Sequence, residues 1–370
     1  MEEWKEYKLE ELIDEISMGP FGSNIKVECF TDSGVPVLNG SNLVGIKLNE
    51  DKFNYVTEEK ATSLGKANAY RNDIVITHRG TLGQIVYIPE NSKYDHYVIS
   101  QSQFRVKCND KVLPQYIVYY FHSRIGQYQL LSNASQVGVP ALARPTTTFQ
   151  KLTVNIPPLP TQQKIVSILS SLDDKIELNN KINENLEQQA QALFDELFPN
   201  VIDDNGLNKM EELITFSNGK KRPEESGTIP VFGGNGILAY TNKSNNENCI
   251  IIGRVGAYCG NVFLSLNDCW ISDNAISAKS KETNSQFFVF YLLKKANLQT
   301  RHIGSGQPLL TQGILNSISI NIPQRQKVEQ FNDLLKPIYE QIFCNSKQNE
   351  NLISIRDTLL PKLMNGEIEV

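Results

Sequence analysis

The sequence contains two copies of one pattern, and this internal repeat constrains the fold more than any other feature. Residues 73–88 match residues 249–264, and residues 98–107 match residues 270–279. Four further segments match in the same order, at offsets of about 163 to 193 residues. Six collinear matches are not expected by chance, and so long a period is that of a whole domain. We therefore predict two similar domains with pseudo-two-fold symmetry, produced by a tandem duplication.

The first part of each copy has the pattern of a globular α+β domain. Short runs rich in β-branched and aromatic residues alternate with turns rich in Gly, Asn and Pro. Each copy also contains one aromatic helix candidate, at 115–124 and at 286–295. The two globular parts are therefore predicted to be similar, β-rich and separately folded.

The second part of each copy has the pattern of one long helix. Its apolar positions are Ile165, Leu169, Leu172, Ile176, Leu186, Leu193 and Leu197, and 166 residues later Phe331, Leu335, Ile338, Ile342, Leu352, Leu359 and Leu363. Steps of four and three residues are typical of a coiled-coil seam. A helix of this length spans roughly 55 Å, at about 1.5 Å per residue.

Such a helix is not expected to bury its apolar stripe against the globular part before it, so its predicted partner is the helix of the other copy. A two-fold relation makes the pair antiparallel and gives a dumbbell with a globular domain at each end. The alternatives are that each helix packs on its own globular part or on a separate chain. Asn179 and Asn345 interrupt the two seams near their midpoints, so we expect them to face each other inside the interface. The alternative is that both point to solvent.

Composition excludes several classes of protein. The longest apolar runs are far shorter than the roughly 18 residues of a membrane span, and the N-terminal segment lacks the apolar core of a signal peptide. The six cysteines form no C-x-x-C pair, so a zinc module and a disulfide scaffold are not expected. These features favour a cytoplasmic protein with reduced thiols and no metal.

The net charge of −5 is unevenly distributed along the chain. Residues 209–324 carry 11 Lys and Arg against 8 Asp and Glu, whereas residues 161–198 carry 3 against 7. Segregated charge of this kind excludes a strongly basic coat protein but leaves nucleic-acid binding open.

Catalytic motifs are not evident in the sequence. Residues 234–239 fit a dinucleotide-binding loop only superficially, because neither the following helix nor the acidic residue is present. Residues 19–26 lack the glycine that directly precedes the lysine in a phosphate-binding loop. The four histidines are scattered along the sequence. We therefore expect no catalytic residues in this chain.

Polar and basic loops on the two globular parts are the best candidates for function. Arg, Lys, Asn, Gln and Ser on Gly-containing loops are the side chains that bond base edges and phosphates in DNA grooves. The candidate DNA-binding residues are Ser23, Asn24, Lys26, Arg79, Thr81, Gln136 and Arg144 in the first copy, and Lys220, Lys221, Arg222, Asn235, Arg254, Tyr258 and Gln307 in the second. Any single loop could be an ordinary solvated turn, but Arg79 and Arg254 occupy matching strand-end turns.

The order of these segments resembles a known family. A P-P-L-x-x-Q-x-x-I-V segment at 157–166 precedes the first long helix, and I-P-Q-R-Q-K-V at 322–328 precedes the second. The whole chain resembles the specificity subunit of type I restriction-modification systems. It departs from the usual pattern at 161–163, where Glu-Gln is common, and at 324–326, which follow a single proline.

This resemblance implies a specific organisation. Residues 1–155 would be the first target recognition domain, 156–200 the first spacer helix, 201–322 the second recognition domain and 323–370 the second spacer helix. Proteins of this family are not enzymes. They read a bipartite, asymmetric double-stranded DNA site, one half per domain.

The same resemblance implies the partners and the cofactors. Two methyltransferase subunits dock along the helices, and two restriction subunits complete the cleaving complex. S-adenosylmethionine and ATP are expected on those partners, and no cofactor is expected on this chain. It implies no base contact of an individual residue. The alternatives are a scaffold that bridges two protein partners through its globular domains, and a catalytic subunit with an unrecognised motif.

Overall fold

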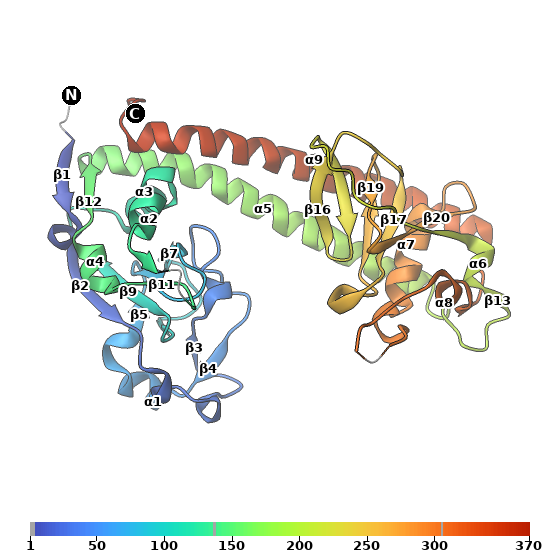
Figure 1. Ribbon diagram of the computed structural model, residues 1–370, viewed down its shortest axis with the longest axis horizontal. Helices are drawn as coiled ribbons and strands as arrows, with labels where there is room; N and C mark the ends of the chain where they lie inside the picture. Colours follow the sequence, from blue (N-terminus) through green and yellow to red (C-terminus); the bar gives the residue numbers. More distant parts are fainter. Residues whose placement is uncertain (1–3, 136–137, 305) are drawn as a thin grey trace. The chain divides into compact units, whose positions relative to one another are not determined.

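The computed structural model describes residues 4–135, 138–304 and 306–370, and it divides into two compact units. The first unit comprises Met1–Glu177 and Asn349–Val370, and the second comprises Leu178–Gln348. Two long helices, α5 (Leu159–Leu197) and α9 (Arg325–Met364), each contribute one part to each unit. Within each unit they run side by side, as the green and red helices of Figure 1 show.

The first unit contains small sheets and short helices around parts of α5 and α9. In chain order the other elements are β1 (Lys5–Lys8), η1 (Leu9–Leu12), β2 (Ile13–Met18), η2 (Gly22–Asn24), η3 (Val27–Cys29), β3 (Val35–Val37), η4 (Gly40–Asn42), β4 (Asn54–Val56), α1 (Glu58–Ser63), η5 (Gly65–Ala67), β5 (Asn68–Tyr70), β6 (Ile74–Thr77), β7 (Ile85–Tyr87), β8 (His96–Val98), β9 (Gln103–Cys108), α2 (Pro114–His122), α3 (Arg124–Leu131), β10 (Ala134–Ser135), β11 (Ala141–Leu142), α4 (Pro145–Gln150) and β12 (Thr153–Ile156).

The second unit repeats most of this plan. Its elements are β13 (Asn208–Lys209), α6 (Met210–Leu213), β14 (Ile214–Asn218), β15 (Ile229–Gly233), β16 (Gly236–Thr241), β17 (Cys249–Gly253), η6 (Gly256–Tyr258), β18 (Val262–Ser265), β19 (Trp270–Ile271), β20 (Ala275–Ser280), α7 (Gln286–Lys295), η7 (Leu298–Thr300), α8 (Gln312–Asn316) and β21 (Ser319–Ile320).

Matching sheets confirm the predicted duplication. The strand order β2-β9-β6-β7 in the first unit corresponds to β14-β20-β17-β18 in the second, and both sheets are antiparallel throughout. A second sheet also recurs: β3 pairs antiparallel with β4 and parallel with β8, as β15 pairs with β16 and β19. In the central strands β6 and β17 every residue is buried, because apolar side chains on both faces are covered.

In the first unit the long helices pack on the globular part as well as on each other. Ile165 and Leu169 of α5 are buried in one core cluster with the aromatic residues of α2 and with Leu363 of α9. The prediction that the apolar stripe could not be buried against the globular part was therefore wrong. Aromatic side chains such as Tyr119 reach the helix surface and cover it, and the hydroxyl of Tyr119 donates to Asp173 at 2.7 Å.

One of the two glutamines of the 157–166 segment, Gln162, holds the start of α5 against the globular part. Gln162 is completely buried; its Oε1 accepts from the Leu113 amide at 2.9 Å, and its Nε2 donates to the carbonyl of Pro157 at 2.9 Å. In the second unit Asn332 of α9 has a similar role, because its Oδ1 accepts from the Phe287 amide at 2.9 Å at the start of α7. Buried amides with paired groups fix one docking geometry.

The helix pair is antiparallel in the second unit, as predicted. Asn179 of α5 donates to Gln348 of α9 at 2.8 Å, and four residues later along α5 Asn183 accepts from Asn345 at 2.8 Å. Asn179 and Asn345 are both buried, at 1% and 6% exposure, so the alternative that they point to solvent is wrong. The side chains of the two seam asparagines therefore bond across the helix pair, to Gln348 and to Asn183.

Candidate nucleic-acid interface

In the first unit, four loops meet at one edge of the sheet β2-β9-β6-β7. This first loop edge consists of residues 19–26, 78–81, 100–102 and 140–144. Strand β2 ends and β9 begins there, and the Gly19 amide donates to the Gln103 carbonyl at 2.8 Å. The loop after β6 is tied to its neighbours, because the His78 amide donates to the Ser102 carbonyl at 2.9 Å.

The first loop edge brings together most of the predicted residues of the first copy. Asn24, Lys26, Arg79, Thr81 and Arg144 are all exposed there. The loop of Arg79 is joined to the segment before Arg144 by a bridge between Arg79 and Ala141 and by a 2.9 Å bond from the Gly80 amide to the Pro140 carbonyl. The side chain of Ser23 and the whole of Gln136 lie outside the described residues.

In the second unit, the equivalent edge of the sheet β14-β20-β17-β18 gathers five loops. This second loop edge consists of residues 219–222, 233–236, 254–258, 272–274 and 306–308. The Gly219 amide donates to the Ala275 carbonyl at 3.0 Å, as Gly19 does to Gln103, which shows that the two edges correspond. A Cβ on Gly219 would lie 2.0 Å from the Ser272 carbonyl oxygen, so only glycine allows this close approach.

The second loop edge contains every predicted residue of the second copy. Lys220, Lys221, Arg222, Asn235 and Gln307 are exposed there, and Tyr258 is half-exposed. The turn of Asn235 is close to Tyr258, because a Cβ on Gly234 would lie 3.6 Å from the Tyr258 Cβ. The loop of Gln307 is bonded to the loop of Arg254 through a 3.0 Å bond from the Gly256 amide to the Pro308 carbonyl.

Arg254 differs from the other predicted residues in being half-buried. Its amide donates to the Asn274 carbonyl at 2.9 Å, and its carbonyl accepts from the Leu310 amide at 2.9 Å. The guanidinium Nη1 lies 3.5 Å from the Asp273 carbonyl oxygen. The backbone of Arg254 is thus held on both sides, so its side chain starts from a fixed position.

Sequence reasoning missed the loop that precedes β9 and β20. Gln101 and Ser102 in the first unit, and Asp273 and Asn274 in the second, lie between the loops that it singled out. The signal was available, because these residues directly precede a repeat-matched strand. A search for basic loops does not identify them, because none of the four is Lys or Arg.

Both loop edges carry an excess of positive charge. Within its defined segments the first loop edge has three Lys or Arg and no Asp or Glu, and the second has four against one aspartate. Burial lowers the pKa of His78 although the Gln101 carbonyl bonded to its ring opposes the shift, so this imidazole is neutral at pH 7. The arrangement suits a polyanion that also presents hydrogen-bonding groups.

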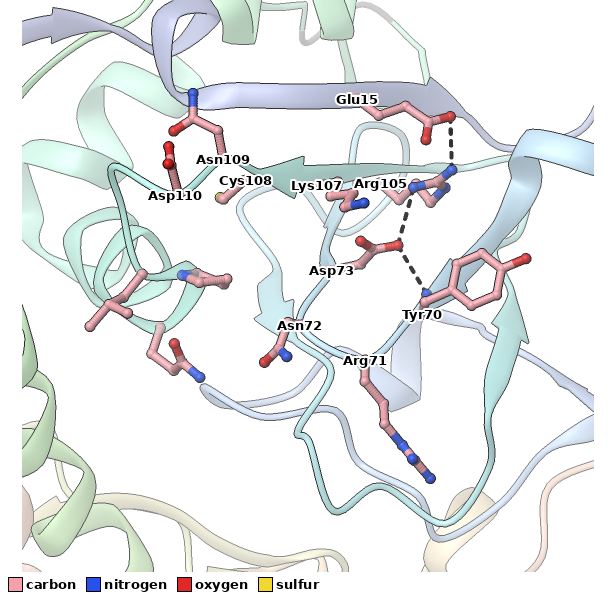
Figure 2. Close-up of a pocket in the computed structure, with 13 residues that line it drawn as sticks. Glu15, Tyr70, Arg71, Asn72, Asp73, Arg105, Lys107, Cys108, Asn109 and Asp110 are labelled. Carbon is pink, nitrogen blue, oxygen red and sulfur yellow. Dashed lines mark hydrogen bonds and ion pairs between the residues drawn. The ribbon is translucent and has the colours of Figure 1, made fainter.

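A cavity of about 620 Å³ lies at the opposite end of the first unit's sheet. Figure 2 shows the charged groups that line it: Arg105 of β9 bonds Asp73 at 3.1 Å and Glu15 at 3.0 Å. The Tyr70 amide also donates to Asp73 at 2.9 Å. None of the predicted residues lines this cavity. Because its buried charges neutralise each other, we assign them to the stability of the first unit.

The described residues form neither a metal site nor a membrane span. Over the residues that the structure describes, no group of three His, Cys, Asp or Glu side chains is placed to hold a metal ion. Among the same residues, none of the helices combines the length and the apolar character that crossing a bilayer requires.

Comparison with known proteins assigns the chain to a family. The family model described as "Type I restriction modification DNA specificity domain" matches residues 1–188 and 208–353. The chain is 25% identical to the type I restriction enzyme HindI specificity subunit of Haemophilus influenzae over the full length of both. It is 24% identical to the MjaIX specificity subunit of Methanocaldococcus jannaschii, over 81% of this chain and 78% of that one.

One solved structure agrees at the level of the fold. The type I restriction-modification system S subunit from M. genitalium superimposes with a TM-score of 0.61 at 17% identity, covering 98% of this chain and 96% of the other. The family model accounts for both copies of the repeat. The chain therefore belongs to the family of type I restriction-modification DNA specificity proteins.

Proposed function

We propose that this chain is the non-catalytic DNA-reading subunit of a type I restriction-modification complex, in which each loop edge reads one half of a bipartite, asymmetric site. One observation carries the proposal: the same edge of the same sheet bears the basic and amide side chains in both units. Equivalent scaffolds favour equivalent docking on DNA, and different side chains on them favour different bases.

We assign different tasks to the cations of the second loop edge. Lys220, Lys221 and Arg222 are exposed and adjacent, which suits contacts to phosphates. Arg254 is half-buried on a fixed backbone, which suits the bidentate contact of a guanidinium with guanine. On the first loop edge His78 occupies the position of Arg254, because the amide of each donates to the carbonyl of the residue just before β9 or β20. Arg79 is the next residue of the same turn, and we assign to it the base contact of the first loop edge.

The partners follow from the family. We propose that two methyltransferase subunits dock along α5 and α9, that two restriction subunits complete the complex, and that the assembly works in the cytoplasm. S-adenosylmethionine and ATP would bind to those partners. The names of the HindI and MjaIX relatives as specificity subunits of restriction enzymes support this assignment.

The first experiment identifies the DNA site and tests the division into halves. Methylome sequencing of the host, with and without the gene, gives the bipartite site. Binding of the chain with its methyltransferase subunits is then measured on that site and on duplexes in which one half is scrambled. We expect Arg79→Ala to weaken discrimination in one half only and Arg254→Ala in the other. Loss of discrimination in both halves from one substitution would contradict independent reading.

Matched controls separate base reading from general charge. Arg71→Ala removes an exposed cation of the first unit at the opposite end of β6, and Arg325→Ala removes one at the start of α9. Neither should alter discrimination.

Two further outcomes decide between the proposal and its alternatives. Binding of S-adenosylmethionine by the isolated chain would favour a catalytic subunit. Unchanged methylation in a strain without the gene, together with equal binding to any duplex, would favour a scaffold that bridges protein partners.

A further inference from the structure

Phe21 is the most exposed apolar side chain of the first loop edge, at 83% exposure. It lies between β2 and η2, in the segment Gly19-Pro20-Phe21-Gly22. A single exposed apolar residue is common on protein surfaces and by itself means little. Phe21 differs from such residues because its backbone is anchored and its neighbours are cations.

The backbone around Phe21 is pressed against the start of β9. A Cβ on Gly19 would lie 1.9 Å from the Ser100 carbonyl oxygen, and a Cβ on Gly22 would lie 2.2 Å from Gln101 Oε1. The Phe21 carbonyl accepts from the Asn24 amide at 2.8 Å, and Pro20 fixes its own φ. Because the flanking glycines touch the neighbouring loop, the segment is anchored while the ring of Phe21 remains in solvent. A ring presented in this way loses little conformational entropy when it binds.

The neighbours of this segment are those of a DNA-binding surface. Lys26, Arg79 and Arg144 supply three cations on the same edge, and the segments that define the edge contain no acidic residue. DNA-binding surfaces combine such cations with apolar side chains that contact the bases.

The second unit differs at the equivalent position. Gly219 corresponds to Gly19, because each amide donates to the carbonyl of the first residue of the central strand β20 or β9. Gly219 is followed by Lys220, Lys221 and Arg222, where Gly19 is followed by Pro20, Phe21 and Gly22. One loop edge therefore presents cations where the other presents an aromatic ring.

We propose that Phe21 is a specificity-determining residue of the first loop edge, which packs its ring on the bases of one half-site. The ring either enters a base step, as apolar wedges do, or covers a thymine methyl group in the major groove. The inference rests on the proposed function and assigns one residue within it.

The test compares the base preferences of the wild-type chain and of Phe21→Ala. Each is purified with its methyltransferase subunits and used to select binding sites from a library of random-sequence duplexes. We expect Phe21→Ala to lose preference at one or two adjacent base pairs of one half-site, and to bind the wild-type site about tenfold more weakly. Phe21→Leu should retain part of the preference. Tyr70→Ala is the matched control, because Tyr70 of β5 is half-exposed and lines the cavity rather than the first loop edge, and it should change nothing.

Two probes distinguish the modes of contact. If the ring enters a base step, 2-aminopurine placed at that step brightens when the wild-type chain binds, and does not when Phe21→Ala binds. If the ring covers a thymine methyl group, deoxyuridine at that position weakens wild-type binding and has no effect on Phe21→Ala. Either result supports the inference.

Other results would overturn it. Phe21→Ala with wild-type preferences and affinity would show that the ring does not contact bases. Unchanged DNA preference with weaker binding of the methyltransferase subunits, measured by calorimetry, would assign Phe21 to a protein interface. If the wild-type chain selects no sequence at all, the proposed function fails and this inference fails with it. The melting temperature of each variant shows whether it is folded.

Discussion

The buried asparagines between α5 and α9 give a quantitative prediction for the second unit. Asn179 and Asn345 are among the few polar residues in this interface that are almost fully buried. Each donates to a residue on the opposite helix, and the two acceptors keep contact with water: Gln348 is exposed and Asn183 is half-buried. Replacing both asparagines with leucine should therefore not leave an acceptor buried and unpaired.

The expected magnitude follows from these contacts. Burying a leucine side chain contributes about 1.5–3 kcal/mol. Each lost hydrogen bond costs about 0.5–1.5 kcal/mol. The net gain in the free energy of unfolding is about 1 kcal/mol for each position and about 2 kcal/mol for both. For a unit of this size that raises the melting temperature by roughly 4–8 °C.

The loss of the asparagines should also weaken the specificity of the pairing. Any slipped register of the natural helices places an amide among apolar residues, and this penalty disappears when both are leucine. Differential scanning calorimetry measures the melting temperature, and light scattering coupled to size exclusion detects chains that associate through their helices. We expect the double variant to be more stable and to form some dimers.

Control variants isolate the effect of burial. Gln188→Leu places a leucine at an exposed position of α5 and should leave the melting temperature almost unchanged. Asn179→Ala should lower it, because a cavity replaces the amide. A lower melting temperature for the double leucine variant would show that the amides stabilise the pair, and our reasoning would be wrong. A more stable variant that stays strictly monomeric would refute the role in register.

Three other predictions concern the rest of the chain. Arg105→Met should destabilise the first unit by about 3–5 kcal/mol in urea unfolding, because Asp73 is left as a buried charge, and adding Asp73→Leu should recover part of the loss. Alanine at each of residues 220–222 should reduce the slope of log affinity against log salt concentration by about one per lost phosphate contact. The base preference should stay unchanged, and a changed preference would show that these residues read bases instead. Inserting four residues after Gln188 lengthens α5 by roughly 6 Å, so the preferred gap between half-sites should grow by about one or two base pairs in a binding-site selection, and an unchanged gap would show that the helix does not set the spacing.

Repetition and periodicity in the sequence are sufficient to predict the two-domain plan and the long helices. The collinear repeat led to two sheets of the same strand order, because equal spacing of buried strands and turns specifies equal topology. The spacing of four and three residues between apolar positions identified α5 and α9, which extend over Leu159–Leu197 and Arg325–Met364. The repeat also placed Arg79 and Arg254 in matching turns after β6 and β17, although the backbone hydrogen bonds align Arg254 with His78, one residue before Arg79.

Which side chains come into contact is set by how the elements pack in three dimensions. The apolar stripes of α5 and α9 read as a simple seam, yet Ile165 and Leu169 are buried among the aromatic residues of α2, which lie about fifty positions earlier in the chain. The ion pairs of Arg105 likewise join β9 to Glu15 of β2 and to Asp73, which directly precedes β6, and no local pattern connects these residues. The exposure of Phe21 is a further case, because it depends on Gly19 and Gly22 fitting against residues 100 and 101. A contact between segments so distant in sequence is set by the packing of the sheet, and the residues next to Phe21 in the sequence do not reveal it.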